Sequence, residues 1–102
     1  MTREYLVFFG KGANNWSAFS QDLPGCGSLG DALEDTRAHM REAMELYLAE
    51  TAKAGEPIPE SEATTVNIDE FDPDHETKQY VLEWLAVSLP QSFSSTEATL
   101  AA

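Results

Sequence analysis

The sequence predicts an α+β domain in which a three- to four-stranded antiparallel sheet carries one long helix on one face. Three observations predict it. Tyr5–Phe9 and Trp16–Phe19 are β-prone runs separated by a turn-rich segment, which is the pattern of a hairpin. Apolar residues then recur at helical spacing from Ala32 to about Lys53. A later apolar run, Thr77–Leu89, is long enough for another strand.

A tight turn follows the second strand. Pro24 presets φ for the second position of a type II turn, and Gly25 accepts the positive φ of the third position. Leu23, just before them, can anchor the turn in a core. We therefore expect a short third strand over Gly25–Leu29, directly before the helix.

The predicted helix is amphipathic and has signals at both ends. Asp31 is placed to cap it, and Glu34 lies three residues further on, which is the spacing of a capping box. Gly55 is typical of the residue just past a helix end. The stripe expected to face a core consists of Leu33, Met40, Ala43, Met44, Tyr47 and Leu48.

The segment after the helix has the least regular pattern. Ala63–Phe71 could form a short edge strand, and residues 69–76, which are interrupted by Pro73, are expected to be an acidic solvated loop. We expect one domain over residues 1–90. The Ser-, Thr- and Ala-rich residues 91–102 are expected to be a disordered tail.

The last strand is apolar on both sides. Alternation places one row, Tyr80, Leu82, Trp84 and Ala86, on one side and the other row, Val81, Glu83, Leu85 and Val87, on the opposite side. A half-exposed strand should instead alternate apolar with polar residues. Because a single helix covers one face, the other face needs a cover. We expect a partner protein or a homo-oligomer, a dimer or tetramer, with Val81, Leu85 and Val87 at its interface. The alternative is that residues 60–76 fold over this face.

The charge indicates the class of partner. Eighteen acidic and six basic residues give a net charge of −12. A nucleic-acid backbone or an anionic membrane attracts Lys and Arg, so neither partner is expected, whereas a basic protein is favoured. The N-terminus has no secretory pattern, and no apolar run approaches the roughly 20 residues of a membrane span. We therefore expect a cytoplasmic protein.

Several possible chemical sites lack the spacing they need. The acids of residues 69–76 do not follow an EF-hand pattern. The single cysteine, Cys26, and the histidines His39 and His75 form neither a zinc motif nor a recognisable nucleophile–base pair. The glycines of residues 25–30 are explained by the turn and the helix start, not by a dinucleotide site. No catalytic, cofactor-binding or metal-binding residue is predicted.

Five short stretches occur in an order and spacing that resemble the HicB antitoxin family. They are Trp16–Phe19, Asp22–Cys26, Gly30–Asp31, Glu42–Leu48 and Gly55–Pro59. The resemblance covers about residues 4–60, and a strand ending in Leu89 and Pro90 also fits. It implies a partial RNase H-like fold and a role as the neutralising partner of a small RNA-cleaving toxin of the HicA type.

Two features of the chain limit what the resemblance implies. An RNase H-type nuclease needs carboxylates gathered around two Mg²⁺ ions, but the first strand has no acid in its middle and Glu4 lies at its start. A metal-dependent nuclease is therefore not expected. Many members of the family carry a C-terminal DNA-binding module, whereas residues 91–102 contain no Lys or Arg. Direct binding of nucleic acid is not expected either.

The sequence therefore predicts a non-enzymatic, antitoxin-like protein whose acidic surface docks on a small basic toxin. The alternative is an oligomeric scaffold of the same fold without a toxin partner. The expected contact residues are acids of the helix and of the later loop: Glu34, Asp35, Glu42, Glu45, Asp69, Asp72 and Asp74.

Overall fold

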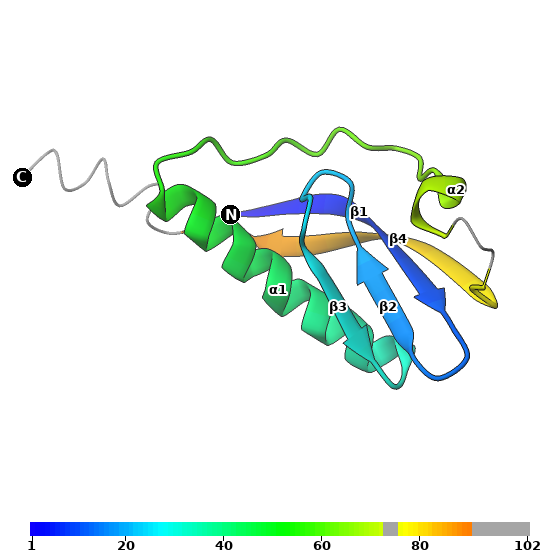
Figure 1. Cartoon of the computed structure of the whole chain (residues 1–102). Coiled ribbons are helices and arrows are strands. Elements are labelled where there is room, and N and C mark those ends of the chain that lie inside the picture. The colour runs from blue at the N-terminus through cyan, green and yellow to red at the C-terminus, as the bar shows by residue number, and fades with distance from the viewer. Residues whose placement is uncertain (73–75, 91–102) are drawn as a thin grey trace, which may run out of the picture.

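The computed structural model in Figure 1 describes residues 1–72 and 76–90. Its elements in chain order are β1 (Thr2–Lys11), β2 (Trp16–Phe19), β3 (Gly27–Gly30), α1 (Leu33–Lys53), α2 (Ile68–Phe71) and β4 (Gln79–Ser88). The strands form one antiparallel sheet in the order β3-β2-β1-β4, and α1 lies across one face of it. The predicted α+β architecture is confirmed. The tail predicted for residues 91–102 lies outside the described residues.

The predicted type II turn joins β2 to β3. The backbone N–H of Cys26 donates to the carbonyl of Leu23 at 3.0 Å, and Gly25 has a φ of 86°. Leu23 is fully buried, so it anchors the turn in the core as expected. Because the turn uses Gly25 and Cys26, the third strand begins at Gly27, two residues later than predicted.

The two ends of α1 differ in how well the sequence predicted them. At the N-terminus the cap residue is Ala32 and no side chain caps it, so the predicted cap by Asp31 is wrong. At the C-terminus, the N–H groups of Gly55 and Glu56 donate to the carbonyls of Ala52 and Thr51, both within 3.1 Å. With a φ of 78° at Gly55, this is a Schellman motif, and the predicted helix end is confirmed.

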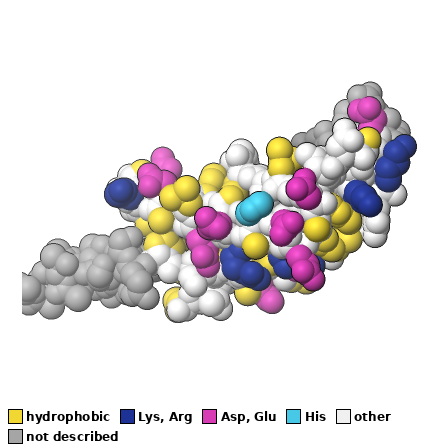
Figure 2. Space-filling model, turned by 90° about the horizontal axis from the view of Figure 1, so that it is seen from below, with side chains coloured by type: hydrophobic (Ala, Val, Ile, Leu, Met, Phe, Trp, Pro, Cys, Tyr) yellow, Lys and Arg dark blue, Asp and Glu magenta, His cyan; other side chains and the backbone are white. Residues whose placement is uncertain are grey.

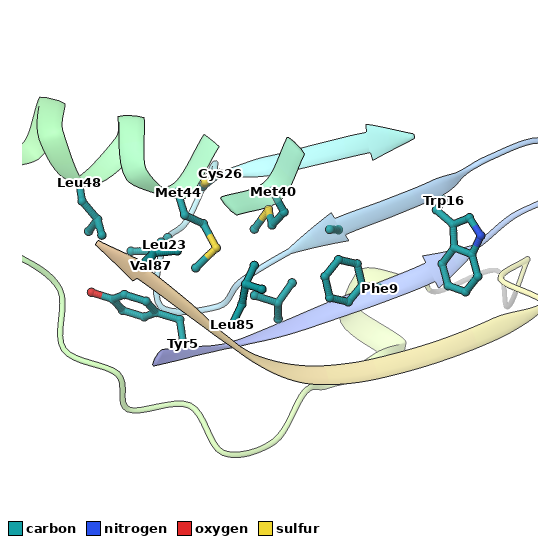
Figure 3. Packing of buried hydrophobic residues seen from close by; sticks show 12 residues of the cluster. Tyr5, Phe9, Trp16, Leu23, Cys26, Met40, Met44, Leu48, Leu85 and Val87 are labelled. Carbon is teal, nitrogen blue, oxygen red and sulfur yellow. The ribbon is translucent and has the colours of Figure 1, made fainter. Parts of the chain in front are cut away.

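The core lies between α1 and the facing side of the sheet (Figure 3). The helix contributes Met40, Met44 and Leu48, which are fully buried. From the strands come Tyr5, Val7 and Phe9 of β1, Trp16 and Ala18 of β2, and Leu85 and Val87 of β4. The predicted helical stripe is therefore the one that faces the core.

This core corrects the predicted oligomer interface. Leu85 and Val87 are each 1% exposed, and Val81 packs against the same cluster. Leu85 and Val87 lie beneath α1 and are not available to a second copy, and Val81 is half-buried against the same core. The prediction chose the wrong row of β4, because alternation separates the two rows without showing which of them the helix covers.

The segment that links α1 to α2 passes along the opposite side of the sheet (Figures 1 and 3). Near its start, the hydroxyl of Tyr5 and the guanidinium of Arg3 donate to the carbonyl of Pro59. Further along, the carboxylate of Asp22 accepts the backbone N–H groups of Glu62 and Ala63. Residues 63–67 form no strand, and Ile68–Phe71 form α2, so the edge strand predicted for Ala63–Phe71 is wrong.

The face opposite α1 is covered in one part and open in another. Leu6 and Phe8 of β1 are 5% and 3% exposed, and the ring of Phe8 stacks on Phe19 at 4.7 Å. On β4, by contrast, Tyr80, Leu82 and Trp84 remain 40%, 53% and 47% exposed. The chain itself therefore covers β1 on this face and leaves this row of β4 uncovered, and the partner or homo-oligomer expected here stays a prediction.

Asp72 holds the segment that leads into β4 in place by hydrogen bonds. It is 8% exposed, and its carboxylate accepts the N–H groups of Glu76 and Thr77 and the hydroxyl of Tyr80. Burial raises the pKa of Asp72, but these hydrogen bonds outweigh it and hold the pKa below its usual value. Asp72 is therefore a structural residue and not the free docking acid that the sequence predicted.

We expect Asp72 to make folding sensitive to acid. Because its pKa is lower in the folded chain, its contribution to stability is fully present above the unfolded pKa of about 4 and is lost as the pH falls through the folded pKa. Urea unfolding of the wild type and of Asp72→Asn between pH 6 and pH 2 measures this. The difference between the two should shrink below about pH 4. A difference that stays constant over this range would contradict the assignment.

Candidate functional site

The predicted docking acids do not form one surface. Glu34 and Asp35 are exposed in the first turn of α1, where the helix dipole favours acids. Glu42 is exposed further along the same helix, and Glu45 is half-buried on it. Asp69 is exposed on α2, which Figure 1 shows across the sheet from α1. Asp74 and His75 lie outside the described residues.

A groove runs between α1 and the start of β3. One hollow of about 520 Å³ lies between the backbone of Gly25–Gly27 and the helix residues Ala43, Leu46 and Tyr47. A second hollow of about 380 Å³ continues toward His39 and shares Ala43 and Leu46 with the first. Leu46 is 63% exposed and, with Ala43, forms an apolar floor that the two hollows share. We call this surface the α1–β3 groove.

The rim of the α1–β3 groove is acidic. Glu42, Glu50 and Glu56 line it, and all three residues are exposed. Figure 2, which views the α1 side, shows hydrophobic side chains lying between acidic ones. An apolar floor with carboxylates around it fits a protein surface that presents an apolar side chain among Lys or Arg.

Of the three rim acids, the sequence analysis predicted only Glu42 as a contact residue. Glu42, Leu46 and Glu50 stand four residues apart and so form one stripe along the helix, and this spacing could have identified Glu50. Glu56 joins them because the Schellman motif turns the chain back at the end of α1. That placement depends on the fold and has no signal in the local sequence.

The opposite flank of α1 is tied to β4 and is not free to dock. The guanidinium of Arg37 donates to both carboxylate oxygens of Glu83, from Nε at 2.8 Å and from Nη2 at 2.9 Å. This paired hydrogen bonding raises the pKa of Arg37. Arg41 donates to the carbonyl of Ala86, and Glu45 accepts the N–H of Ser88. The predicted docking residue Glu45 therefore already has a partner within the chain.

Cys26 and His39, although both lie along the groove, do not form a catalytic pair. Cys26 is buried at the end of the type II turn, and this burial raises the pKa of its thiol, which opposes formation of the reactive thiolate. His39 lies 2.8 Å through Nδ1 from the carbonyl of Leu29. Since a carbonyl only accepts, Nδ1 carries the proton and the ring fastens α1 to β3.

The described part of the chain offers no metal centre. Across residues 1–72 and 76–90, no three His, Cys, Asp or Glu side chains gather closely enough to hold a metal ion. Neither helix in this part of the chain is both long and apolar enough to cross a membrane. Among the described residues, the α1–β3 groove combines an apolar floor with an acidic rim, which makes it a candidate site for a protein partner.

Comparison with known protein families shows which family the chain belongs to. The family model described as a HicB-like antitoxin of bacterial toxin–antitoxin systems matches residues 5–97. The chain belongs to this HicB-like antitoxin family. The match extends past β4, beyond the region of residues 4–60 in which the sequence motifs were found. A search of curated proteins gave no match to this HicB-like chain.

Solved structures support the same fold for the HicB-like chain. A toxin–antitoxin complex from Streptococcus pneumoniae is similar with a TM-score of 0.71 and 14% identity, over 86% of this chain and 70% of that one. A HicA3 and HicB3 toxin–antitoxin complex gives 0.57 and 21%, over 85% and 98%. The antitoxin HicB of Burkholderia pseudomallei gives 0.57 and 24%, over 89% and 66%.

Proposed function

We propose that this HicB-like antitoxin neutralises a small, basic, RNA-cleaving toxin by receiving it in the α1–β3 groove. Membership of the antitoxin family supports the toxin as partner. The observation that carries the choice of surface is the groove itself, in which exposed Leu46 lies between Glu42 and Glu50. The structural relatives that come from toxin–antitoxin complexes support the same class of partner.

The chemistry of the groove suits such a toxin. A protein that cleaves RNA must present Lys or Arg to the phosphate backbone. Glu42, Glu50 and Glu56 offer carboxylates to the same cations, while Ala43, Leu46 and Tyr47 bury an apolar side chain between them. RNA and antitoxin then compete for one basic surface, so a bound antitoxin excludes the substrate.

We propose that the protein acts by binding and not by catalysis. The middle of β1, Tyr5–Phe9, consists of buried residues without a carboxylate, and Glu4 is exposed at the edge of this run. Carboxylates clustered around metal ions, which an RNase H-type reaction needs, are therefore not built on this strand. The cytoplasm, where a toxin would meet cellular RNA, is the proposed place of action.

Co-expression with a small basic protein whose gene is found next to that of this chain tests the proposal. We expect the two to co-purify at moderate salt, and we expect the antitoxin to relieve growth arrest caused by the basic protein. Leu46→Lys, which places a cation among the rim acids and against the basic partner, should abolish both effects. Absence of a complex with the wild-type chain would overturn the proposed function. A normal complex with Leu46→Lys would overturn the groove as its site.

A further inference from the structure

The outer strand β3 has an edge that its own side chains do not protect. β3 pairs with β2 on its inner side, and within residues 1–72 and 76–90 no strand pairs with it on the other side. Folded proteins protect such edges with charged residues, with proline or with a covering segment. The strand Gly27–Gly30 contains only glycine, serine and leucine, and its Leu29 is 61% exposed. None of these side chains blocks the approach of another strand.

The hydrogen bonds of the neighbouring hairpin show which backbone groups reach this edge. The N–H of Gly12 donates to the carbonyl of Asn15 at 2.9 Å, where β1 turns into β2. Since hydrogen-bonded pairs recur at every second residue, the odd-numbered residues of β2 bond to β1 and the even-numbered ones bond to β3. Ser28 lies opposite an even-numbered residue and so bonds to β2. The backbone groups of Gly27 and Leu29 therefore point to the free edge.

His39 of α1 marks one end of the open part of this edge. Its Nδ1 donates to the carbonyl of Leu29 at 2.8 Å, as expected for a carbonyl that points away from β2. Three backbone groups then remain directed to the edge: the N–H and the carbonyl of Gly27, and the N–H of Leu29. Because Gly25 and Gly27 have no side chains, a neighbouring chain can approach this backbone closely.

Hollows flank the start of β3 on both faces of the sheet. The first is the hollow of about 520 Å³ in the α1–β3 groove, with Leu46 in its wall. The second, of about 450 Å³, lies between Gly25–Gly27, Phe19 and Pro24, and no residue of α1 lines it. Phe19 stacks on Phe8 of the face opposite α1, so the second hollow opens on that face. Side chains of an added strand alternate between the two faces, so each hollow can receive one of them.

We propose that the toxin presents an extended segment that pairs with the free edge of β3 as a fifth strand of the sheet. This inference rests on the proposed function, because it states how the toxin occupies the α1–β3 groove. Gly27 and Leu29 supply the backbone hydrogen bonds. One large apolar side chain of the segment packs on Ala43 and Leu46, and its neighbour enters the hollow beside Phe19.

Charge favours a basic toxin strand at this edge over a second copy of the chain. The exposed acids Glu42, Glu50 and Glu56 lie around the groove beside it. A second copy would bring the same acids and a further net charge of −12, whereas Lys or Arg next to the apolar side chain would pair with them. The other outer strand, β4, has a single charged residue, Glu83, which Arg37 already neutralises. β3 is therefore the outer strand that suits a basic partner.

Proline at position 29 tests the pairing on the full chain. Leu29→Pro removes the N–H that points to the edge and leaves the hydrogen bonds between β3 and β2 in place. The matched control, Leu29→Val, has a side chain of similar size and keeps the N–H. In isothermal titration with the small basic protein of the co-expression test, Leu29→Pro should weaken binding roughly tenfold or more, since a buried carbonyl of the toxin loses its donor. Leu29→Val should bind within a few-fold of the wild type.

Amide hydrogen exchange of the wild-type chain gives a readout that does not depend on how Leu29→Pro folds. In the free chain the amides of Gly27 and Leu29 should exchange much faster than that of Ser28, which already bonds to β2. With the basic protein bound, both amides should slow toward the rate of Ser28.

Binding and exchange together distinguish the possible outcomes. If the basic protein does not bind the wild type, the proposed function fails and the added strand fails with it. If it binds the wild type and Leu29→Pro equally, and Gly27 and Leu29 keep their free exchange rates, the toxin uses the groove without adding a strand and only this inference is wrong. Exchange at these two amides that slows with the concentration of the chain alone would assign the edge to a second copy, and would also overturn it.

Discussion

Truncation of Leu85 to alanine is expected to lower the free energy of unfolding by about 3 kcal/mol, the range seen for buried leucines that leave a cavity. Leu85 is 1% exposed and packs in the core beneath α1. Leu82, three residues earlier on the same strand, is 53% exposed and faces the other way. The same truncation at Leu82 is expected to cost less than about 1 kcal/mol, since little burial is lost.

Urea unfolding of the two variants, followed by circular dichroism at low micromolar concentration, measures the difference. The midpoint of Leu85→Ala should fall well below that of Leu82→Ala, with similar dependence on urea. Equal costs for the two truncations would mean that β4 does not present the Leu85 row to the helix. A larger cost at Leu82 would mean that the rows of β4 are reversed.

This pair of leucines also marks how far the sequence could predict the fold. The strands, the type II turn and the C-terminal end of α1 follow from local signals, because Pro24, Gly25 and Gly55 set backbone angles that few other residues accept. The row of β4 that is buried follows from which side of the sheet α1 occupies. That choice depends on contacts distant in sequence, and both rows are apolar enough to suit either side.

The segment between α1 and α2 and the candidate site also depend on contacts that are distant in sequence, which limited their prediction. The path of the chain between α1 and α2 depends on Asp22 and Tyr5, which lie far away in the sequence, whereas the local pattern of Ala63–Phe71 suggested an edge strand. For the site, composition predicted an acidic docking surface, and the predicted Glu42 does line the α1–β3 groove. Helical spacing could have added Glu50, whereas Glu56 required knowledge of where the chain turns back.

Reversal of the groove acids is expected to have the largest effect on toxin binding. The triple variant Glu42→Lys, Glu50→Lys and Glu56→Lys should weaken the complex by roughly 100-fold or more, which corresponds to about 2.7 kcal/mol. Three attractive carboxylates become three repulsive ammonium groups around the same apolar floor. Isothermal titration with the purified basic partner at physiological salt gives the affinity.

The matched control reverses three exposed acids away from the groove: Glu4→Lys, Glu62→Lys and Glu76→Lys. Each triple variant changes the net charge from −12 to −6, since three residues each change by two units. Any effect of overall charge is therefore shared, and the control should bind within a few-fold of the wild type. Equal weakening by the two variants would show that overall charge, and not the groove, governs binding.

The most direct test of the account maps the toxin onto the surface of the labelled antitoxin by nuclear magnetic resonance. On addition of unlabelled toxin, the largest chemical-shift changes are expected at Ala43, Leu46 and Tyr47, with Leu82 and Trp84 little changed. If the changes gather instead on β4 while the α1–β3 groove keeps its free-state shifts, the groove is not where this antitoxin binds its toxin.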